Sequence, residues 1–245
     1  MLNKLADAIS KSRFVVFDND GVTYRITPEM MQACSHAAAL ATQKFVPGLS
    51  YENAKALCQG YYRKYHSSTY GLVIDYGVDH AEVHDIYHKL VDERHVPKDD
   101  VLPELFESFI LPRALLTNGS RDWTNRVLNR LRLRAYFPDH SIYPFEDVDY
   151  QRKAASEKPF RHVLDREGFC ASDSIMVEDT PGNLIHAKKI GMKTVLVSDE
   201  TIGPFSQFDH IDFTVPNIRT FLRLMGNRSS IEHQAIPVQP SNSIK

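Results

Sequence analysis

Two pairs of acidic residues stand where carboxylates could bind a metal ion or attack a substrate. Asp18 and Asp20 follow the apolar run 14–17, and Glu178 and Asp179 follow a second predicted strand, 174–177. Neighbouring carboxylates offer the hard oxygen ligands that Mg²⁺ prefers, and a carboxylate can form a covalent phosphoryl intermediate. Taken alone, either pair is equally consistent with a polar turn that ends a strand.

Polar residues at two further positions could bind a phosphate group next to these acids. Thr117 and Asn118 follow the apolar run 114–116, and Lys158 precedes Pro159 at a predicted helix start. A hydroxyl and an amide suit phosphoryl oxygens, and a lysine can supply positive charge to a phosphate dianion. The carboxyl ends of parallel strands gather at one edge of a sheet, so all four positions would converge if their strands are parallel.

The pattern after residue 103 predicts such a sheet. Short apolar strands alternate there with amphipathic helices of about ten residues, which is typical of an α/β fold with a doubly wound parallel sheet. The predicted strands are 14–17, 113–117, 141–145, 174–177, 194–197 and 213–215, and the predicted helices are 102–109, 122–133, 159–167, 181–190 and 217–225.

Residues 27–100 carry almost no strand signal and predict an all-helical insertion. Thr27, Ser50 and Asp79 have the residue types and positions of helix N-caps, and residues 66–79 are expected to form an irregular connection. The chain therefore divides into an α/β core, 1–26 and 101–226, and a helical insertion, 27–100. Residues 1–13 suggest a short amphipathic helix, and the polar tail 227–245 is expected to be disordered.

Composition excludes several classes of function. The 245 residues carry a net charge of −2 and are 42% hydrophobic, which offers no basic surface for nucleic acid and no membrane span of about 20 apolar residues. The N-terminus mixes charged and apolar residues and does not resemble a signal peptide. Three widely spaced cysteines suggest free thiols and a cytoplasmic protein. Composition does not indicate an oligomeric state.

The order of these motifs resembles the haloacid dehalogenase-like hydrolase superfamily, from about residue 14 to residue 197. The superfamily pattern is Asp-x-Asp-x-[Thr/Val], then Ser or Thr, then Lys, then an acidic pair. The matching residues here are Asp18-Asn-Asp20-Gly-Val22, Thr117, Lys158 and Glu178-Asp179. The resemblance implies a Rossmann-like core, and it implies that the helical insertion is a C1-type cap.

The same resemblance implies a mechanism. Asp18 would attack phosphorus, and Asp20 would protonate the leaving oxygen. The Asp18 carboxylate, the Asp20 backbone carbonyl and Asp179 would hold Mg²⁺, with Glu178 binding it directly or through water. Thr117, the Asn118 backbone and Lys158 would bind the phosphoryl oxygens. Asn183 would support the acidic pair.

Within the superfamily the likeness is greatest to pyrimidine 5′-nucleotidases, which implies a small phosphorylated substrate such as a nucleoside monophosphate. The matching stretches are 48–50, 61–65, 70–72, 117–119, 126–128 and 191–197. Gly21 and Glu178 depart from that family, which usually has Asn and Asp at these positions. Tyr61, Tyr62, Tyr65 and Tyr70 suit the interior of the cap, and one of the four is expected to face the nucleobase. Replacing Tyr65 or Tyr70 by Ala is expected to weaken the preference for pyrimidine nucleotides.

Three alternatives remain open at this stage. A haloacid dehalogenase would use the same nucleophile but would need neither Asp20 nor the pair Glu178-Asp179. A phosphomutase of the β-phosphoglucomutase type would share every core residue and differ in its cap. A non-catalytic phosphate-binding protein would be expected to lack at least one of Asp18, Asp20, Lys158 and Asp179, and all four are present.

Overall fold

The computed structural model describes residues 11–198 and 208–226. The disorder predicted for residues 227–245 concerns residues outside this part, and so does most of the helix predicted over residues 1–13. Within the described part, the predicted α/β fold is confirmed. Six strands form one parallel sheet in the order β3-β2-β1-β4-β5-β6. The strands are β1 (Phe14–Phe17), β2 (Arg113–Leu116), β3 (Ile142–Tyr143), β4 (Ser174–Glu178), β5 (Lys193–Val197) and β6 (Phe213–Val215).

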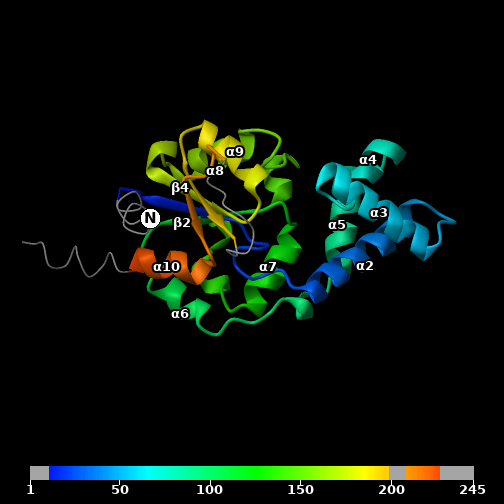
Figure 1. The fold of residues 1–245 in the computed structure, drawn as a ribbon, viewed down its shortest axis with the longest axis horizontal. Coiled ribbons are helices and arrows are strands. Elements are labelled where there is room, and N and C mark those ends of the chain that lie inside the picture. The colour runs from blue at the N-terminus through cyan, green and yellow to red at the C-terminus, as the bar shows by residue number, and fades with distance from the viewer. Residues whose placement is uncertain (1–10, 199–207, 227–245) are drawn as a thin grey trace, which may run out of the picture.

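Helices cover both faces of this sheet (Figure 1). On one face lie α8 (Lys158–Glu167) and α9 (Pro181–Lys189), and on the other lie α6 (Leu102–Glu107), α7 (Arg121–Arg130) and α10 (Ile218–Gly226). Single turns of 3₁₀ helix occupy Glu93–His95, Arg134–Tyr136, Asp139–Ser141, Phe145–Val148 and Ala171–Asp173.

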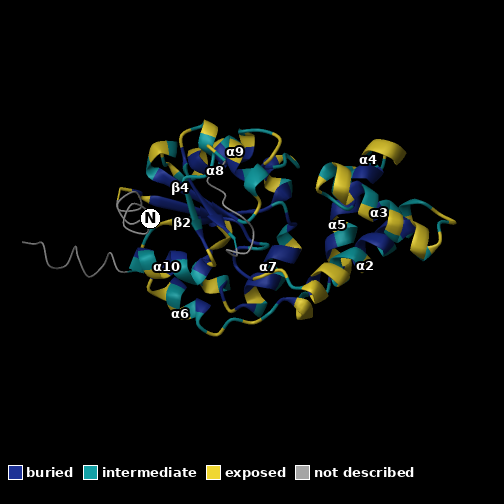
Figure 2. Cartoon of the chain, viewed as in Figure 1, coloured by how far each residue is buried: buried dark blue, intermediate teal, exposed yellow. Residues whose placement is uncertain are grey.

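The two apolar cores follow from the alternation of side chains along the strands. Phe17 points to one face and packs edge-on against Phe106 and Phe221. Phe14 and Val16 point to the other face and belong to the core under α8 and α9. Figure 2 shows the strands as the most continuously buried part of the molecule, as expected for a parallel sheet covered on both sides.

Of the helices between β1 and β2 in the sequence, four stand to one side of the sheet in Figure 1. They are α2 (Pro28–Phe45), α3 (Tyr51–Tyr65), α4 (Tyr70–Tyr76) and α5 (His80–Leu90). The predicted N-caps are confirmed, because the side chains of Thr27, Ser50 and Asp79 accept hydrogen bonds from Met30, Asn53 and Glu82.

The prediction that residues 66–79 form an irregular connection is wrong, because α4 lies within them. Helix α4 begins without a side-chain cap at Thr69, so its start carries little sequence signal. Close packing stabilises it instead. A Cβ at Gly71 would lie 2.0 Å from Cδ1 of Tyr61, so only glycine allows this approach to the Tyr61 ring.

Helix α5 joins this group of helices to the sheet domain. Arg126 on α7 donates hydrogen bonds to the carbonyl oxygens of His88 (2.6 Å) and Val91 (2.9 Å), at the carboxyl end of α5. Its guanidinium also pairs with Glu93 at 2.6 Å. A cation at this end of a helix satisfies free carbonyl groups and favours the helix dipole. Among the described helices, none combines the length and apolar character needed to cross a bilayer.

Candidate active site

The two predicted acidic pairs meet because β1 and β4 are adjacent parallel strands. Phe17 pairs with Val177 in the sheet, and the backbone N–H of Asp18 donates to the Val177 carbonyl at 2.9 Å. Both strands therefore end at the same edge. One ligand oxygen from each of Asp18, Glu178 and Asp179 lies within 4.8 Å of the others. This register explains why acids that are far apart in sequence form one cluster.

A buried lysine joins this cluster, and it is Lys153. Its Nζ lies 2.7 Å from Asp18 Oδ1 and 2.6 Å from Glu178 Oε2, and it also donates to the Leu116 carbonyl at 3.2 Å. Lys153 is only 1% exposed. A lysine is rarely buried to this degree unless its charge is paired, and here two carboxylates compensate it.

The assignment of the site lysine to Lys158 is therefore corrected. Lys158 is the first residue of α8, is exposed, and has no ion pair or hydrogen bond from its side chain among the described residues. The chain brings in Lys153 instead because Asp149 and Tyr150 both adopt left-handed backbone conformations, with φ of 54° and 55°. Such conformations are uncommon outside glycine, and although Asp adopts them more often than most residues, Tyr does not, so the sequence gives little indication of two in a row.

The charges of the cluster perturb one another. Burial and then the charge of Glu178 raise the pKa of Asp18 well above its usual value, and the same two causes raise the pKa of Asp179. Burial would also raise the pKa of Glu178, but Lys153 and a hydrogen bond from Asn183 outweigh it and lower that pKa. Lys153 thus stabilises Glu178 as an anion, whereas at Asp18 and Asp179 its charge only partly offsets burial and the repulsion from Glu178.

This donor set fits a divalent cation. The carboxylates of Asp18, Glu178 and Asp179 and the ammonium group of Lys153 have a net formal charge of two negative charges when all are ionised. The raised pKa values of Asp18 and Asp179 reflect this excess of negative charge. All the donors are oxygens, as Mg²⁺ requires. Gly21 makes room for the cluster, because a Cβ there would lie 1.9 Å from Oδ2 of Asp179. Gly21, a departure from the nucleotidase pattern, is thus needed for the approach of Asp179.

Asp20 is held apart from this cluster by two hydrogen bonds. Tyr24 Oη and Trp123 Nε1 both donate to its Oδ1, the latter at 2.8 Å. The other oxygen, Oδ2, faces Gly119, where a Cβ would approach it to 3.3 Å. Burial raises the pKa of Asp20, and the hydrogen bonds from Tyr24 and Trp123 partly offset this shift. A carboxyl group with a raised pKa and one free oxygen is suited to general acid catalysis.

The loop after β2 faces the same edge of the sheet. The Thr117 hydroxyl oxygen accepts from the Gly119 N–H at 2.9 Å, so its hydroxyl hydrogen is free to donate elsewhere. The Asn118 carbonyl accepts from His84 Nε2 of α5 at 2.9 Å. Burial lowers the pKa of His84, which keeps its imidazole neutral. Thr117 and Asn118 thus lie at the same edge of the sheet as the acidic cluster, as predicted. The hydrogen bond from His84 also connects this loop to the helical insertion.

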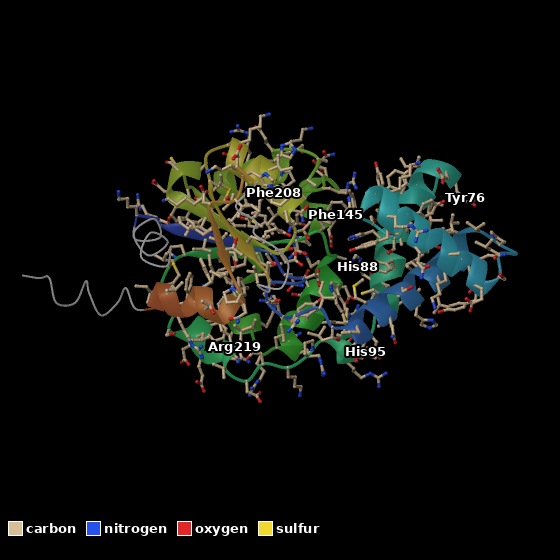
Figure 3. The ribbon with its side chains drawn as sticks, viewed as in Figure 1. Tyr76, His88, His95, Phe145, Phe208 and Arg219 are labelled. Atoms are coloured by element: carbon tan, nitrogen blue, oxygen red, sulfur yellow. The ribbon has the colours of Figure 1, made fainter. Side chains whose placement is uncertain are left out.

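A cavity of about 860 Å³ opens from Asp20 into the helical insertion. Residues of α2, α3 and α5 line it together with Tyr24 and Trp123. Figure 3 shows His88, which also lines it, where α5 approaches the core. The aromatic rings along its wall include those of Tyr24, Tyr51, Tyr62, Tyr87 and Trp123.

Of the four tyrosines of which one is expected to face a nucleobase, Tyr62 lines this cavity. Tyr65 and Tyr70, the two positions predicted to affect selectivity, do not line it. They lie beside Arg152 of the core, which donates to the Tyr65 carbonyl at 2.7 Å and stacks 4.6 Å from the centre of the Tyr70 ring. Tyr61 packs inside the insertion and donates to Asp75. Helical spacing alone did not distinguish these positions from Tyr62, which does line the cavity.

Comparison with known proteins agrees with this arrangement. A sequence model of the haloacid dehalogenase-like hydrolases matches residues 13–191. Similar solved structures include the HAD phosphatase from Thermococcus onnurineus, with a TM-score of 0.60. They also include the HAD-hydrolase YfnB from Bacillus subtilis bound to magnesium, with a TM-score of 0.59. L-2-haloacid dehalogenase from Xanthobacter autotrophicus, with chloropropionic acid covalently bound, has a TM-score of 0.54.

Each of these three structures is 16% identical to this chain, and each match covers 87% of this chain and 98% of the other. At that identity the likeness concerns the fold, and phosphatases and dehalogenases share it. The family match spans most of the sequence and includes β1 and β4, the strands that carry the acidic cluster. This chain therefore belongs to the haloacid dehalogenase-like hydrolases.

Proposed function

We propose that this protein is a Mg²⁺-dependent phosphomonoesterase that acts through an aspartyl-phosphate on Asp18. The observation that carries this proposal is that Asp18 and Asp20 have different surroundings, which suit them to different roles. Asp18 lies in a metal-binding cluster beside Lys153, whereas Asp20 is held outside it by Tyr24 and Trp123. A nucleophile and a separate proton donor are what a two-step phosphoryl transfer to water requires.

In the first step, an Asp18 oxygen forms a bond to phosphorus and the bond from phosphorus to the leaving oxygen breaks. Asp20 gives its proton to that oxygen. In the second step, a water molecule attacks the phosphoryl group, Asp20 takes the proton of the water, and the Asp18 carboxylate is released. Both protons thus pass through Asp20, whose free Oδ2 faces the loop at Gly119.

The phosphoryl oxygens would be bound by the Thr117 hydroxyl, the Asn118 backbone and the ammonium group of Lys153, which takes the role expected of Lys158. Charge stabilisation of this kind supplies most of the catalysis in phosphoryl transfer.

The Asp18 and Asp179 carboxylates and the Asp20 carbonyl would hold Mg²⁺. When bound, this ion supplies positive charge to the phosphoryl group and to the crowded carboxylates. Glu178 already accepts from Lys153, Asn183 and the Thr180 N–H, which favours its contact with the metal through water.

Residues 27–100 would act as a cap that contacts the leaving group, since the cavity next to Asp20 extends into α2, α3 and α5. Its volume and aromatic wall suit a nucleoside, and the stretches that resemble pyrimidine 5′-nucleotidases favour a pyrimidine base, so we propose pyrimidine nucleoside 5′-monophosphates as substrates. Cys34, Cys58 and Cys170 are free thiols, which supports our expectation of a cytoplasmic protein.

The proposed activity predicts hydrolysis of p-nitrophenyl phosphate that needs Mg²⁺ and is lost in excess EDTA, because the clustered carboxylates would otherwise repel a phosphate dianion. Release of p-nitrophenol measures it, and readdition of Mg²⁺ is the control. Release of chloride from 2-chloropropionate, unaffected by EDTA, would instead identify a dehalogenase and refute the proposal.

The lining of the cavity predicts selectivity. We expect kcat/KM to be about tenfold higher for UMP or CMP than for AMP or glucose 6-phosphate. Replacing Tyr62 by Ala should shrink this preference roughly three- to tenfold, because the ring forms part of the cavity wall. Tyr76→Ala is a matched control, since Tyr62 and Tyr76 are both 49% exposed but only Tyr62 lines the cavity. A clear preference for purine nucleotides or sugar phosphates would refute the nucleotidase assignment.

Lys153, which precedes α8, and Lys158, its first residue, give a paired prediction. Lys153→Met should lower kcat/KM for p-nitrophenyl phosphate about 10²- to 10³-fold, because it removes the positive charge beside Asp18. Lys158→Met, on the exposed start of α8, should change it less than about twofold. Circular dichroism checks that both variants fold. A large loss in Lys158→Met alone would contradict the placement of Lys153.

A further inference from the structure

The cavity next to Asp20 has a basic side that the proposed chemistry does not use. Lys55 and Arg63 both line it from α3, and residues eight apart lie about two turns along the same face of a helix. Neither side chain forms a hydrogen bond or ion pair with any other residue that the structure describes, whereas Arg126, at the junction of α5 and the core, pairs with Glu93 and Asp122.

Neither cation has a carboxylate partner in the part of the cavity that the structure describes. Among the described residues that line it, Asp20 is the only acid, and one of its oxygens is already taken by Tyr24 and Trp123. Lys55 is half-buried and Arg63 is exposed, and both line the cavity without a partner in the described part of the chain. An anionic ligand in the cavity would therefore meet two cations that are free to pair with it.

The rest of the wall indicates the shape of such a ligand. Ile26, Met31 and Tyr62 are among the most exposed large apolar side chains of the described protein, and all three line this cavity. The cavity thus combines an apolar and aromatic wall with two unpaired cations and with the carboxyl group of Asp20, the proposed proton donor to the leaving group. An apolar or aromatic body that carries an anionic group matches both features.

We propose that Lys55, with Arg63, binds a second anionic group, a carboxylate or a phosphate, on the leaving group of the substrate. This inference rests on the proposed phosphomonoesterase activity, and it predicts that monoesters whose leaving group carries a second anion, such as a nucleoside with a second phosphate or a carboxylate, are better substrates than UMP or CMP. Lys55 would then determine specificity without taking part in bond cleavage.

Matched aryl phosphates test this inference. The substrates 4-carboxyphenyl phosphate and 4-carbamoylphenyl phosphate have nearly the same shape and differ in charge, and 1,4-phenylene bisphosphate carries a phosphate in place of the carboxylate. We expect the intact protein to prefer the carboxylate or the bisphosphate over the amide about tenfold in kcat/KM. Whichever of the two is preferred identifies the anion. Lys55→Gln should reduce that ratio to about one, and Lys44→Gln, an exposed lysine of α2 outside the cavity, should leave it unchanged.

Measuring how tightly the leaving groups bind, without any phosphate ester, tests the anion site independently of the proposed phosphomonoesterase activity. Trp123 is the only tryptophan of the chain and lines the cavity, so its fluorescence should report 4-hydroxybenzoate binding without any hydrolysis. We expect 4-hydroxybenzoate to bind about tenfold more tightly than 4-hydroxybenzamide, with the difference lost in Lys55→Gln. This result would support the anion site even if no phosphate ester is hydrolysed. Equal binding of the acid and the amide, or a preference that survives in both Lys55→Gln and Arg63→Gln, would overturn it.

Discussion

Replacing Asp18 by Asn should lower kcat for phosphomonoester hydrolysis by at least about 10⁴-fold, the scale expected when a covalent nucleophile is removed. The amide can still accept the hydrogen bond that Lys153 gives to Oδ1, so the local geometry should persist. The substitution also removes a negative charge from the repulsive cluster with Glu178 and Asp179. We therefore expect that the melting temperature of the metal-free protein does not fall.

Asp165→Asn is the matched control for this variant, because Asp165 is exposed on α8, away from the sheet edge. It should retain full activity. Steady-state kinetics with p-nitrophenyl phosphate, together with thermal melts by circular dichroism, measure both properties. Substantial turnover by folded Asp18→Asn would show that another group attacks phosphorus.

Replacing Asp20 by Asn should lower kcat/KM about 10²- to 10⁴-fold for an alkyl phosphate, whose leaving oxygen needs a proton. The loss should be much smaller for p-nitrophenyl phosphate, because p-nitrophenolate leaves without protonation and kcat/KM reports the first displacement. The Asn oxygen can keep both hydrogen bonds from Tyr24 and Trp123, so the change is confined to the proton that the other oxygen carries.

The ratio of the two losses is the informative quantity, measured with the same preparation and the same Mg²⁺ concentration. Equal losses of kcat/KM for the alkyl and the p-nitrophenyl ester would argue against proton donation by Asp20. They would indicate that the residue acts through the geometry of the cluster instead.

The acidic cluster could be predicted from the sequence because it depends on strong local signals. Asp18 and the pair Glu178-Asp179 follow β-branched and apolar runs, which identify buried strands. Alternation of strands and helices makes those strands parallel, and parallel strands bring their carboxyl ends together. Thr117 at the end of β2 reached the same edge for the same reason. The helix starts at Thr27, Ser50 and Asp79 could be predicted for a similar reason, because an N-cap residue forms its hydrogen bond within the first turn of its own helix.

The features that sequence missed depend on distant packing or rare backbone conformations. Lys153 reaches the cluster through the left-handed residues Asp149 and Tyr150, whereas the Lys-Pro pair at Lys158 suggested the wrong lysine. The partnership of Trp123 with Asp20 joins residues 103 positions apart in the chain, and no periodicity indicates it. The choice of Tyr65 or Tyr70 rather than Tyr62 as the selectivity position missed for a similar reason, because the tyrosine that lines the cavity is determined by how α3 lies against α2 and α5.

The central claim is that Asp18 carries the phosphoryl group between two displacements, and mass spectrometry of the quenched protein tests it most directly. The Asp20→Asn variant should react with p-nitrophenyl phosphate and Mg²⁺ but release the phosphoryl group slowly, because the general base is missing. After acid quenching we expect a burst of one p-nitrophenol per protein and a peptide that contains Asp18 and has gained one phosphoryl group. The adduct should be absent from Asp18→Asn. Steady turnover with no adduct, or an adduct on a different residue, would contradict the account.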